Sequence, residues 1–126
     1  MSELNLLIVD DSATMRKIIK LNLTKIGYSN IIEAAHGAEA LQKLSTEKVD
    51  LIFSDWNMPE MNGLQFLQKV RSESGYQNIP IIMLTTVSTQ DEVVAALKAG
   101  ANSYIVKPFT LDKLKEKIEA VMKGSA

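Results

Sequence analysis

The amino-acid sequence predicts an α/β protein: a doubly wound, five-stranded parallel sheet with helices on both faces. Short apolar segments alternate with longer segments of helical periodicity along the whole chain, which is the pattern of successive βα units. The strand-like segments are also continuously apolar rather than alternating, which indicates burial on both faces of the sheet. With 126 residues, the chain has the length of one ordinary domain, and we expect a single domain over residues 1–126.

Each expected strand is a run of three or four mostly apolar residues bounded by polar or turn-forming ones. In chain order the expected strands are 6–9 (LLIV), 31–34 (IIEA), 51–54 (LIFS), 81–84 (IIML) and 104–106 (YIV). Runs of this length that are rich in β-branched residues are typical of strands.

The segments between these strands carry apolar residues at intervals of three or four. The first predicted helix runs from Met15 to Ile26 and stops at Gly27, and the next two cover 37–47 and 63–72. Thr89 followed by Glu92 resembles a capping box for a fourth helix that ends near Gly100. Thr110 is expected to cap the last helix, whose inward residues are predicted to be Leu111, Leu114, Ile118, Val121 and Met122.

Composition and charge exclude several classes of function. The chain has no cysteine, which rules out disulfides, thiolate zinc sites and cysteine nucleophiles. A net charge of −1 without a basic block argues against binding to nucleic acid. The N-terminus lacks a signal-peptide pattern, and "LNLLIV" is far too short to span a bilayer. We therefore expect a cytoplasmic monomer without a membrane or nucleic-acid partner.

Polar side chains follow four of the expected strands at the point where each strand ends. They are Asp10 and Asp11 after the first strand, Asp55 after the third, Thr85 and Thr86 after the fourth, and Lys107 after the fifth. Ligands of open α/β sheets bind at this edge. If the first and third strands are neighbours, three carboxylates meet there. Two like charges at ~4 Å repel by about 4 kcal/mol at an effective dielectric near 20, so a lysine or a divalent cation must compensate them.

This set of residues could support phosphoryl chemistry. Carboxylates form aspartyl-phosphates, Mg²⁺ binds through one or two carboxylates together with waters and a phosphate oxygen, and phosphoryl transfer depends mainly on positioning and charge neutralisation. Each residue also has a plain structural interpretation. Asp10 and Asp11 could cap the first helix, Thr85 could satisfy backbone groups, and Tyr104 could be an edge-packing aromatic residue.

Four motifs together resemble the receiver domain of two-component systems: "LIVDDS", "SDWNMP", "MLTT" and "IVKPF". Each motif is weak alone, but their order and spacing on five βα units are highly specific and cover essentially the whole chain. The segments "DWNMPEMNG" and "ANSYIVKPFT" are most similar to the stand-alone chemotaxis regulators of that family. The resemblance implies a flavodoxin-like sheet with strand order 2-1-3-4-5.

The resemblance also implies roles for the matching residues. Asp55 is expected to accept a phosphoryl group from a sensor histidine kinase, while Thr85 and Lys107 contact the phosphoryl oxygens. The Lys107–Pro108 peptide is expected to be cis, which is uncommon. Trp56, beside Asp55, should report metal binding by its fluorescence. The expected Mg²⁺ ligands are Asp10 (through a bound water), Asp11, Asp55 and the backbone carbonyl of Asn57.

A partner-binding face is implied on the fourth helix, fifth strand and fifth helix. Its expected residues are Tyr104, Thr86, Val106 and Lys117. Tyr104 would move inward as Thr85 moves toward the phosphoryl group, and Lys117 would contact an acidic partner segment. The implied target is the flagellar motor switch protein, with a phosphatase as a further partner. The alternative is a phosphorelay intermediate that passes its phosphoryl group to a histidine phosphotransfer protein.

Two other classes of function are less consistent with the sequence. An aspartate-nucleophile phosphatase tends to carry its nucleophile, and an acid two residues later, after the first strand, whereas here the candidate nucleophile follows the third strand and position 57 is Asn. An FMN-binding protein would need a phosphate loop rich in Ser, Thr and Gly after the first strand, where this chain has Asp10 and Asp11. We expect no enzyme activity beyond the protein's own phosphorylation and dephosphorylation.

Overall fold

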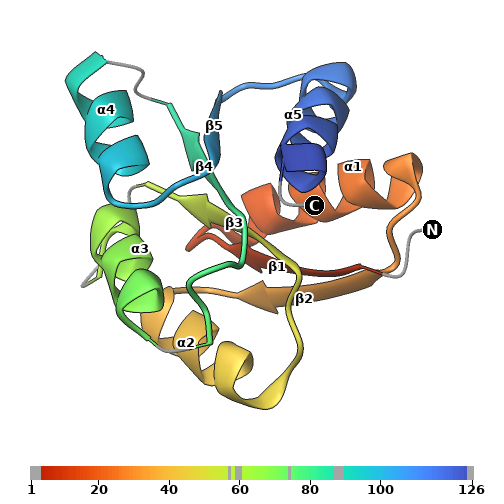
Figure 1. Cartoon of the computed structure of the whole chain (residues 1–126). Coiled ribbons are helices and arrows are strands. Elements are labelled where there is room, and N and C mark those ends of the chain that lie inside the picture. Colours follow the sequence, from red (N-terminus) through yellow and green to blue (C-terminus); the bar gives the residue numbers. More distant parts are fainter. Residues whose placement is uncertain (1–3, 57, 59–60, 74, 87–89, 125–126) are drawn as a thin grey trace.

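The computed structural model describes residues 4–56, 58, 61–73, 75–86 and 90–124. Strands and helices alternate along this part of the chain (Figure 1). The strands are β1 (Asn5–Val9), β2 (Asn30–Ala34), β3 (Leu51–Asp55), β4 (Ile81–Thr85) and β5 (Ser103–Val106). The helices are α1 (Ala13–Ile26), α2 (Gly37–Thr46), α3 (Gly63–Ser72), α4 (Gln90–Lys98) and α5 (Leu111–Gly124). All the predicted elements are present, and each strand is one residue longer than predicted.

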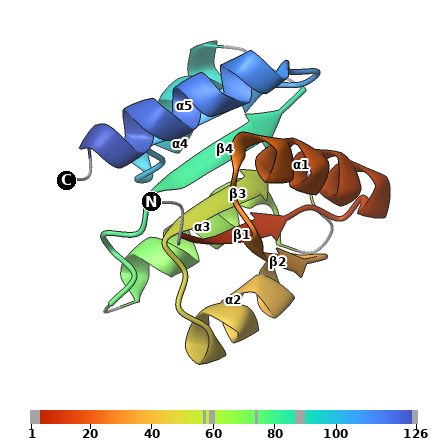
Figure 2. The same ribbon diagram turned by 90° about the vertical axis from the view of Figure 1, so that its right-hand side faces the viewer.

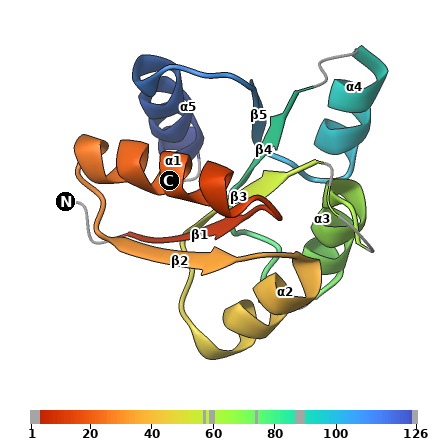
Figure 3. The same cartoon turned by 180° about the vertical axis from the view of Figure 1, so that it is seen from behind.

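The strands form one parallel sheet in the order β2-β1-β3-β4-β5, which confirms the predicted fold class and strand order. Val9 pairs with Ser54, Asp55 with Leu84, and Thr85 with Val106. The carboxyl ends of β1, β3, β4 and β5 therefore reach the same edge of the sheet. Figure 2 shows α1 and α5 as neighbours, whereas α2, α3 and α4 follow one another along the other face of the sheet in Figure 3.

The core consists of two apolar layers, one on each face of the sheet. Successive strand residues point to opposite faces, so Leu7 and Val9 pack against α2 and α3, while Leu6 and Ile8 pack against α1 and α5. All four of these side chains are fully buried. The continuous apolar strands therefore reflect helices on both faces, as the sequence indicated.

Side chains at the helix ends explain where most helices begin. Ser12 caps α1 and accepts a hydrogen bond from the Met15 N–H. Thr110 Oγ1 accepts a hydrogen bond from the Lys113 N–H at 3.0 Å, as predicted for the last helix. His36 caps α2 through its Nδ1 atom, a role that the sequence did not indicate. Thr89, predicted to cap the fourth helix, lies outside the described residues.

One residue of the last helix does not lie where the periodicity placed it. Leu111, predicted to point inward, is exposed, because it opens α5 beyond the end of β5 at Val106 and has no strand beneath it. Gly27 ends α1 with φ 126°, a backbone conformation that side chains disfavour, so the predicted stop is confirmed. Within the described residues, no helix has the length and apolar character needed to cross a bilayer.

Candidate functional site

The polar residues singled out in the sequence lie at the carboxyl edge of the sheet. Asp10 follows β1, Asp55 ends β3, Thr85 ends β4 and Lys107 follows β5. Because these four strands are parallel and successive in the sheet, their ends form one continuous edge, where open α/β sheets bind ligands.

Three carboxylates meet at this edge. One oxygen each of Asp10, Asp11 and Asp55 lies within 4.8 Å of the other two. Asp10 and Asp55 are buried while Asp11 is exposed, so the cluster is reached from solvent on the Asp11 side. Hard carboxylate oxygens are the ligands that Mg²⁺ prefers, and this donor set fits such an ion. Asn57, expected to add a backbone carbonyl, lies outside the described residues.

Lys107 supplies the positive charge within this cluster. Its Nζ lies 3.2 Å from Asp10 Oδ2 and 3.1 Å from Asp55 Oδ1, and its side chain is only 9% exposed. Two buried carboxylates close together would repel strongly, and an ammonium that contacts both offsets that repulsion. The backbone N–H of Lys107 also donates to the Thr85 carbonyl at 2.7 Å, which links the ends of β4 and β5.

The side chain of Asp10 faces the site rather than the helix that follows. Its Oδ1 accepts a hydrogen bond from the Ser12 N–H at 2.8 Å, and its Oδ2 contacts Lys107. Because Ser12 is the N-cap of α1, the helix cap that Asp10 and Asp11 could have provided comes from the next residue. Both oxygens of this buried carboxylate therefore have a partner.

Thr85 and Tyr104 line the same small cavity. Thr85 is buried, and the cavity is also lined by Trp56 and Glu92. Tyr104 is partly buried and also lines a groove on the outer side of β5. The ring therefore stands between the inner cavity and the outer surface.

The Lys107–Pro108 peptide is cis, as predicted.

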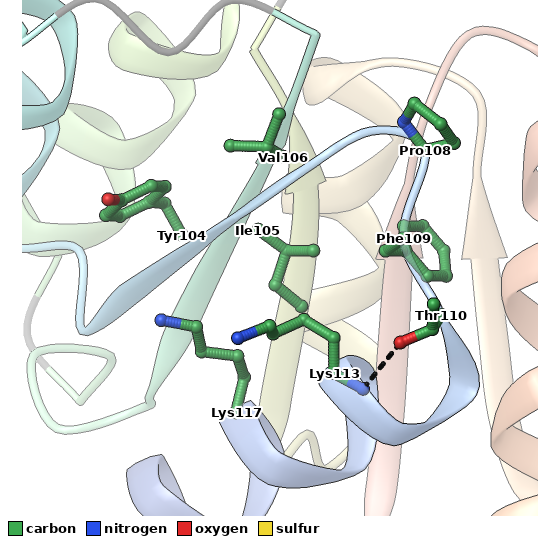
Figure 4. Close-up of a pocket in the computed structure, with 8 residues that line it drawn as sticks. All are labelled: Tyr104, Ile105, Val106, Pro108, Phe109, Thr110, Lys113 and Lys117. Atoms are coloured by element: carbon green, nitrogen blue, oxygen red, sulfur yellow. Dashed lines mark hydrogen bonds between the residues drawn. The ribbon is translucent and has the colours of Figure 1, made fainter.

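The groove outside β5 brings together three of the four residues expected on the partner face. Its volume is about 330 Å³. Tyr104 and Val106 come from β5, Lys117 comes from α5, and Phe109 comes from the segment that joins them (Figure 4). Lys117 Nζ lies 5.3 Å from the centre of the Tyr104 ring, a cation–π contact. Thr86 is exposed at the end of β4 and does not line this groove.

Comparison with known proteins extends over nearly the whole chain. The family model of the response regulator receiver domain matches residues 6–119. Chemotaxis protein CheY1 of Helicobacter pylori is 55% identical over 120 residues, which is 94% of this chain and 97% of that protein. A chemotaxis protein CheY homolog of Campylobacter jejuni is also 55% identical over 120 residues, covering 94% of this chain and 92% of the relative.

Solved structures show the same architecture. Chemotaxis protein CheY4 of Vibrio cholerae has a TM-score of 0.89 at 37% identity, with 94% of this chain and 98% of that chain covered. A CheY-like receiver domain protein of Methanospirillum hungatei has a TM-score of 0.88 at 31% identity, with 98% and 97% covered.

Proposed function

This chain belongs to the family of response regulator receiver domains, and from that premise we propose that it is a phosphorylation-activated chemotaxis regulator whose phosphoryl acceptor is Asp55. The observation that carries the proposal is the buried Asp55 carboxylate, which contacts Lys107 at 3.1 Å and lies beside Asp10 and Asp11. The phosphoryl donor is a phosphohistidine of a sensor histidine kinase.

The transfer is a displacement at phosphorus. A carboxylate oxygen of Asp55 forms the new P–O bond, the P–N bond to the histidine breaks, and the imidazole leaves with the electron pair and takes up a proton. Lys107 neutralises charge on the transferring group, and the Thr85 hydroxyl donates a hydrogen bond to it. Because the transition state is loose, these positioned charges supply most of the catalysis.

Asp10, Asp11 and Asp55 would hold Mg²⁺. When bound, the ion neutralises negative charge on the phosphoryl oxygens. Asp10 is fixed by Ser12 and Lys107, so its carboxylate is oriented before a cation arrives. Exposed Asp11 gives the cation access from solvent. The protein acts on no separate substrate, because the only group it modifies is its own Asp55.

Phosphorylation is read by another protein at the groove outside β5. The groove is lined by apolar side chains, among them Val106 and Phe109, and by Lys113 and Lys117 (Figure 4). This chemistry fits a partner segment that carries apolar and acidic side chains. The partner is the flagellar motor switch protein, which implies a cytoplasmic site of action, and a phosphatase would end the signal.

Intact mass spectrometry after incubation with acetyl phosphate and Mg²⁺ tests the acceptor. We expect one base-labile phosphoryl adduct in the parent and none in Asp55→Asn. Asp112→Asn is the matched control, because Asp112 is an exposed acid in the first turn of α5, and it should label like the parent. Equal labelling of Asp55→Asn and the parent would show that the acceptor is another residue.

Binding measurements separate motor control from a phosphorelay. Acetyl phosphate should strengthen binding of the parent to the motor switch protein and leave Asp55→Asn unchanged. Rapid transfer of the phosphoryl group to a histidine phosphotransfer protein, without stronger binding to the motor switch protein, would instead identify a relay intermediate.

A further inference from the structure

Arg16, in the first turns of α1, contacts the loop that carries the acidic pair. Its Nη1 donates a hydrogen bond to the backbone carbonyl of Asp10 at 2.6 Å, and its Nε donates to Glu33 Oε1 on β2 at 3.1 Å. The Arg16 side chain is 18% exposed. A guanidinium is planar and presents its donors in a rigid fork, so two contacts from different elements fix its orientation.

The accepted carbonyl belongs to the peptide unit that joins Asp10 to Asp11. Because a peptide unit is planar, holding this oxygen also sets the direction in which the chain enters Asp11. The other polar groups of Asp10 are held as well, since its N–H donates to the Ala34 carbonyl at 3.1 Å. The Asp11 carboxylate, in contrast, makes no hydrogen bond or ion pair in the described part of the chain, so its position depends on this backbone.

We propose that Arg16 is a positioning residue for the Mg²⁺ site, acting through the Asp10–Asp11 peptide; the inference rests on the site proposed above. The charge of Arg16 would have the opposite effect. A cation near the cluster repels Mg²⁺, so if Arg16 acted only through its charge, removing it would strengthen Mg²⁺ binding. Loss of positioning loosens binding, so the sign of the change separates the two effects.

Titration of Trp56 fluorescence with MgCl₂ provides the test. Arg16→Met should bind Mg²⁺ about tenfold more weakly than the parent, at the lower end of the effects seen when the outer support of a metal ligand is lost. Lys20→Met is the matched control: Lys20 also pairs with Glu33, at 3.6 Å, and is half-exposed. It removes the same charge without a contact to the acidic loop and should stay within about twofold of the parent.

A second readout distinguishes positioning from a general structural defect. If Arg16 acts through Mg²⁺ affinity, the slower acetyl phosphate labelling of Arg16→Met should return to the parent rate at saturating Mg²⁺. Arg16→Lys is a second variant, which can be measured should Arg16→Met not fold. It keeps the charge but cannot make both contacts, so it should bind Mg²⁺ several-fold more weakly than the parent.

Two results would have different meanings. If the parent itself shows no Mg²⁺ response, or shows one that Asp11→Asn retains, the proposed metal site is wrong. The second case is a parent whose Trp56 fluorescence responds to Mg²⁺ and an Asp11→Asn variant that shows no response. The metal site is then supported, but a folded Arg16→Met or Arg16→Lys that binds Mg²⁺ as tightly as the parent refutes the positioning role of Arg16.

Discussion

Replacing Lys107 by methionine would remove the ammonium that contacts the carboxylates of Asp10 and Asp55. Methionine keeps much of the apolar stem, so the change isolates the charge. At 3.1 and 3.2 Å from Asp55 and Asp10, each attraction amounts to about 5 kcal/mol at an effective dielectric near 20. Desolvation of the buried ammonium offsets much of this gain.

The net effect is set by the two buried acids that remain. Removing one partner of a buried ion pair typically costs about 3–5 kcal/mol, because a charge is left uncompensated. We expect Lys107→Met to lower the free energy of unfolding by about 3 kcal/mol at pH 7 in the absence of metal. Mg²⁺ should restore more stability to the variant than to the parent, since no ammonium then competes for the carboxylates.

Urea unfolding with and without MgCl₂ measures both effects. Lys113→Met is the matched control, because Lys113 is an exposed lysine whose pair with Glu116, at 3.1 Å, lies on the surface of α5. Its loss should change stability by less than about 1 kcal/mol. If Lys107→Met costs no more than the control, or if Mg²⁺ stabilises variant and parent equally, then Lys107 does not compensate the acidic cluster.

Four further substitutions test the scaffold that carries the site. Gly63→Ala would place a Cβ against the backbone carbonyl of Asp55 and should lower the free energy of unfolding, measured in urea, by about 2 kcal/mol. Gly37→Ala is its control, because the new Cβ would first meet the flexible side chain of Met61, and the loss should be smaller. Burial lowers the pKa of Arg71. This side chain donates hydrogen bonds to Gly100 and Asn102 before β5 and to the Tyr76 carbonyl before β4. Arg71→Met leaves these acceptors unpaired and should lower the thermal midpoint, while acetyl phosphate labelling of the folded variant should equal that of the parent. Burial and, to a smaller extent, Glu119 on α5 raise the pKa of Tyr28 above its usual value of 10.0. The unfolded chain therefore loses the phenolic proton first, and the free energy of unfolding falls as the pH rises from about 10 through the raised pKa. Tyr28→Phe should lose less stability over this pH range, and a loss equal to that of the parent would contradict the assignment.

The fold and the edge that carries the site could be predicted because they depend on patterns of period and order. Continuous apolar runs such as 81–84 require cover on both faces, and a parallel sheet brings the residues after its strands to one edge. Asp10, Asp55 and Lys107 lie at such positions, and the structure brings them together at that edge.

Contacts between side chains and distant backbone could not be predicted in the same way. Spacing places Arg16 on α1, but only the structure shows that its guanidinium reaches back to the Asp10 carbonyl and across to Glu33 on β2. The sequence offered Asp10 and Asp11 as possible caps of α1, but the backbone places the next residue, Ser12, at the N-cap. Leu111 fits the periodicity of α5, yet the short β5 leaves it uncovered.

The buried polar side chains of this protein are concentrated at the functional edge of the sheet, where they lower stability. Among the described residues, four polar or charged ones are buried, and they are Asp10, Ser54, Asp55 and Thr85. Three of these lie at the carboxyl edge of the sheet, while the remaining core is apolar. Buried carboxylates are costly unless paired, and a core selected for stability alone would place apolar residues there. One ammonium cannot fully compensate several carboxylates, so this edge of the sheet is the place where a bound cation would recover most of the cost.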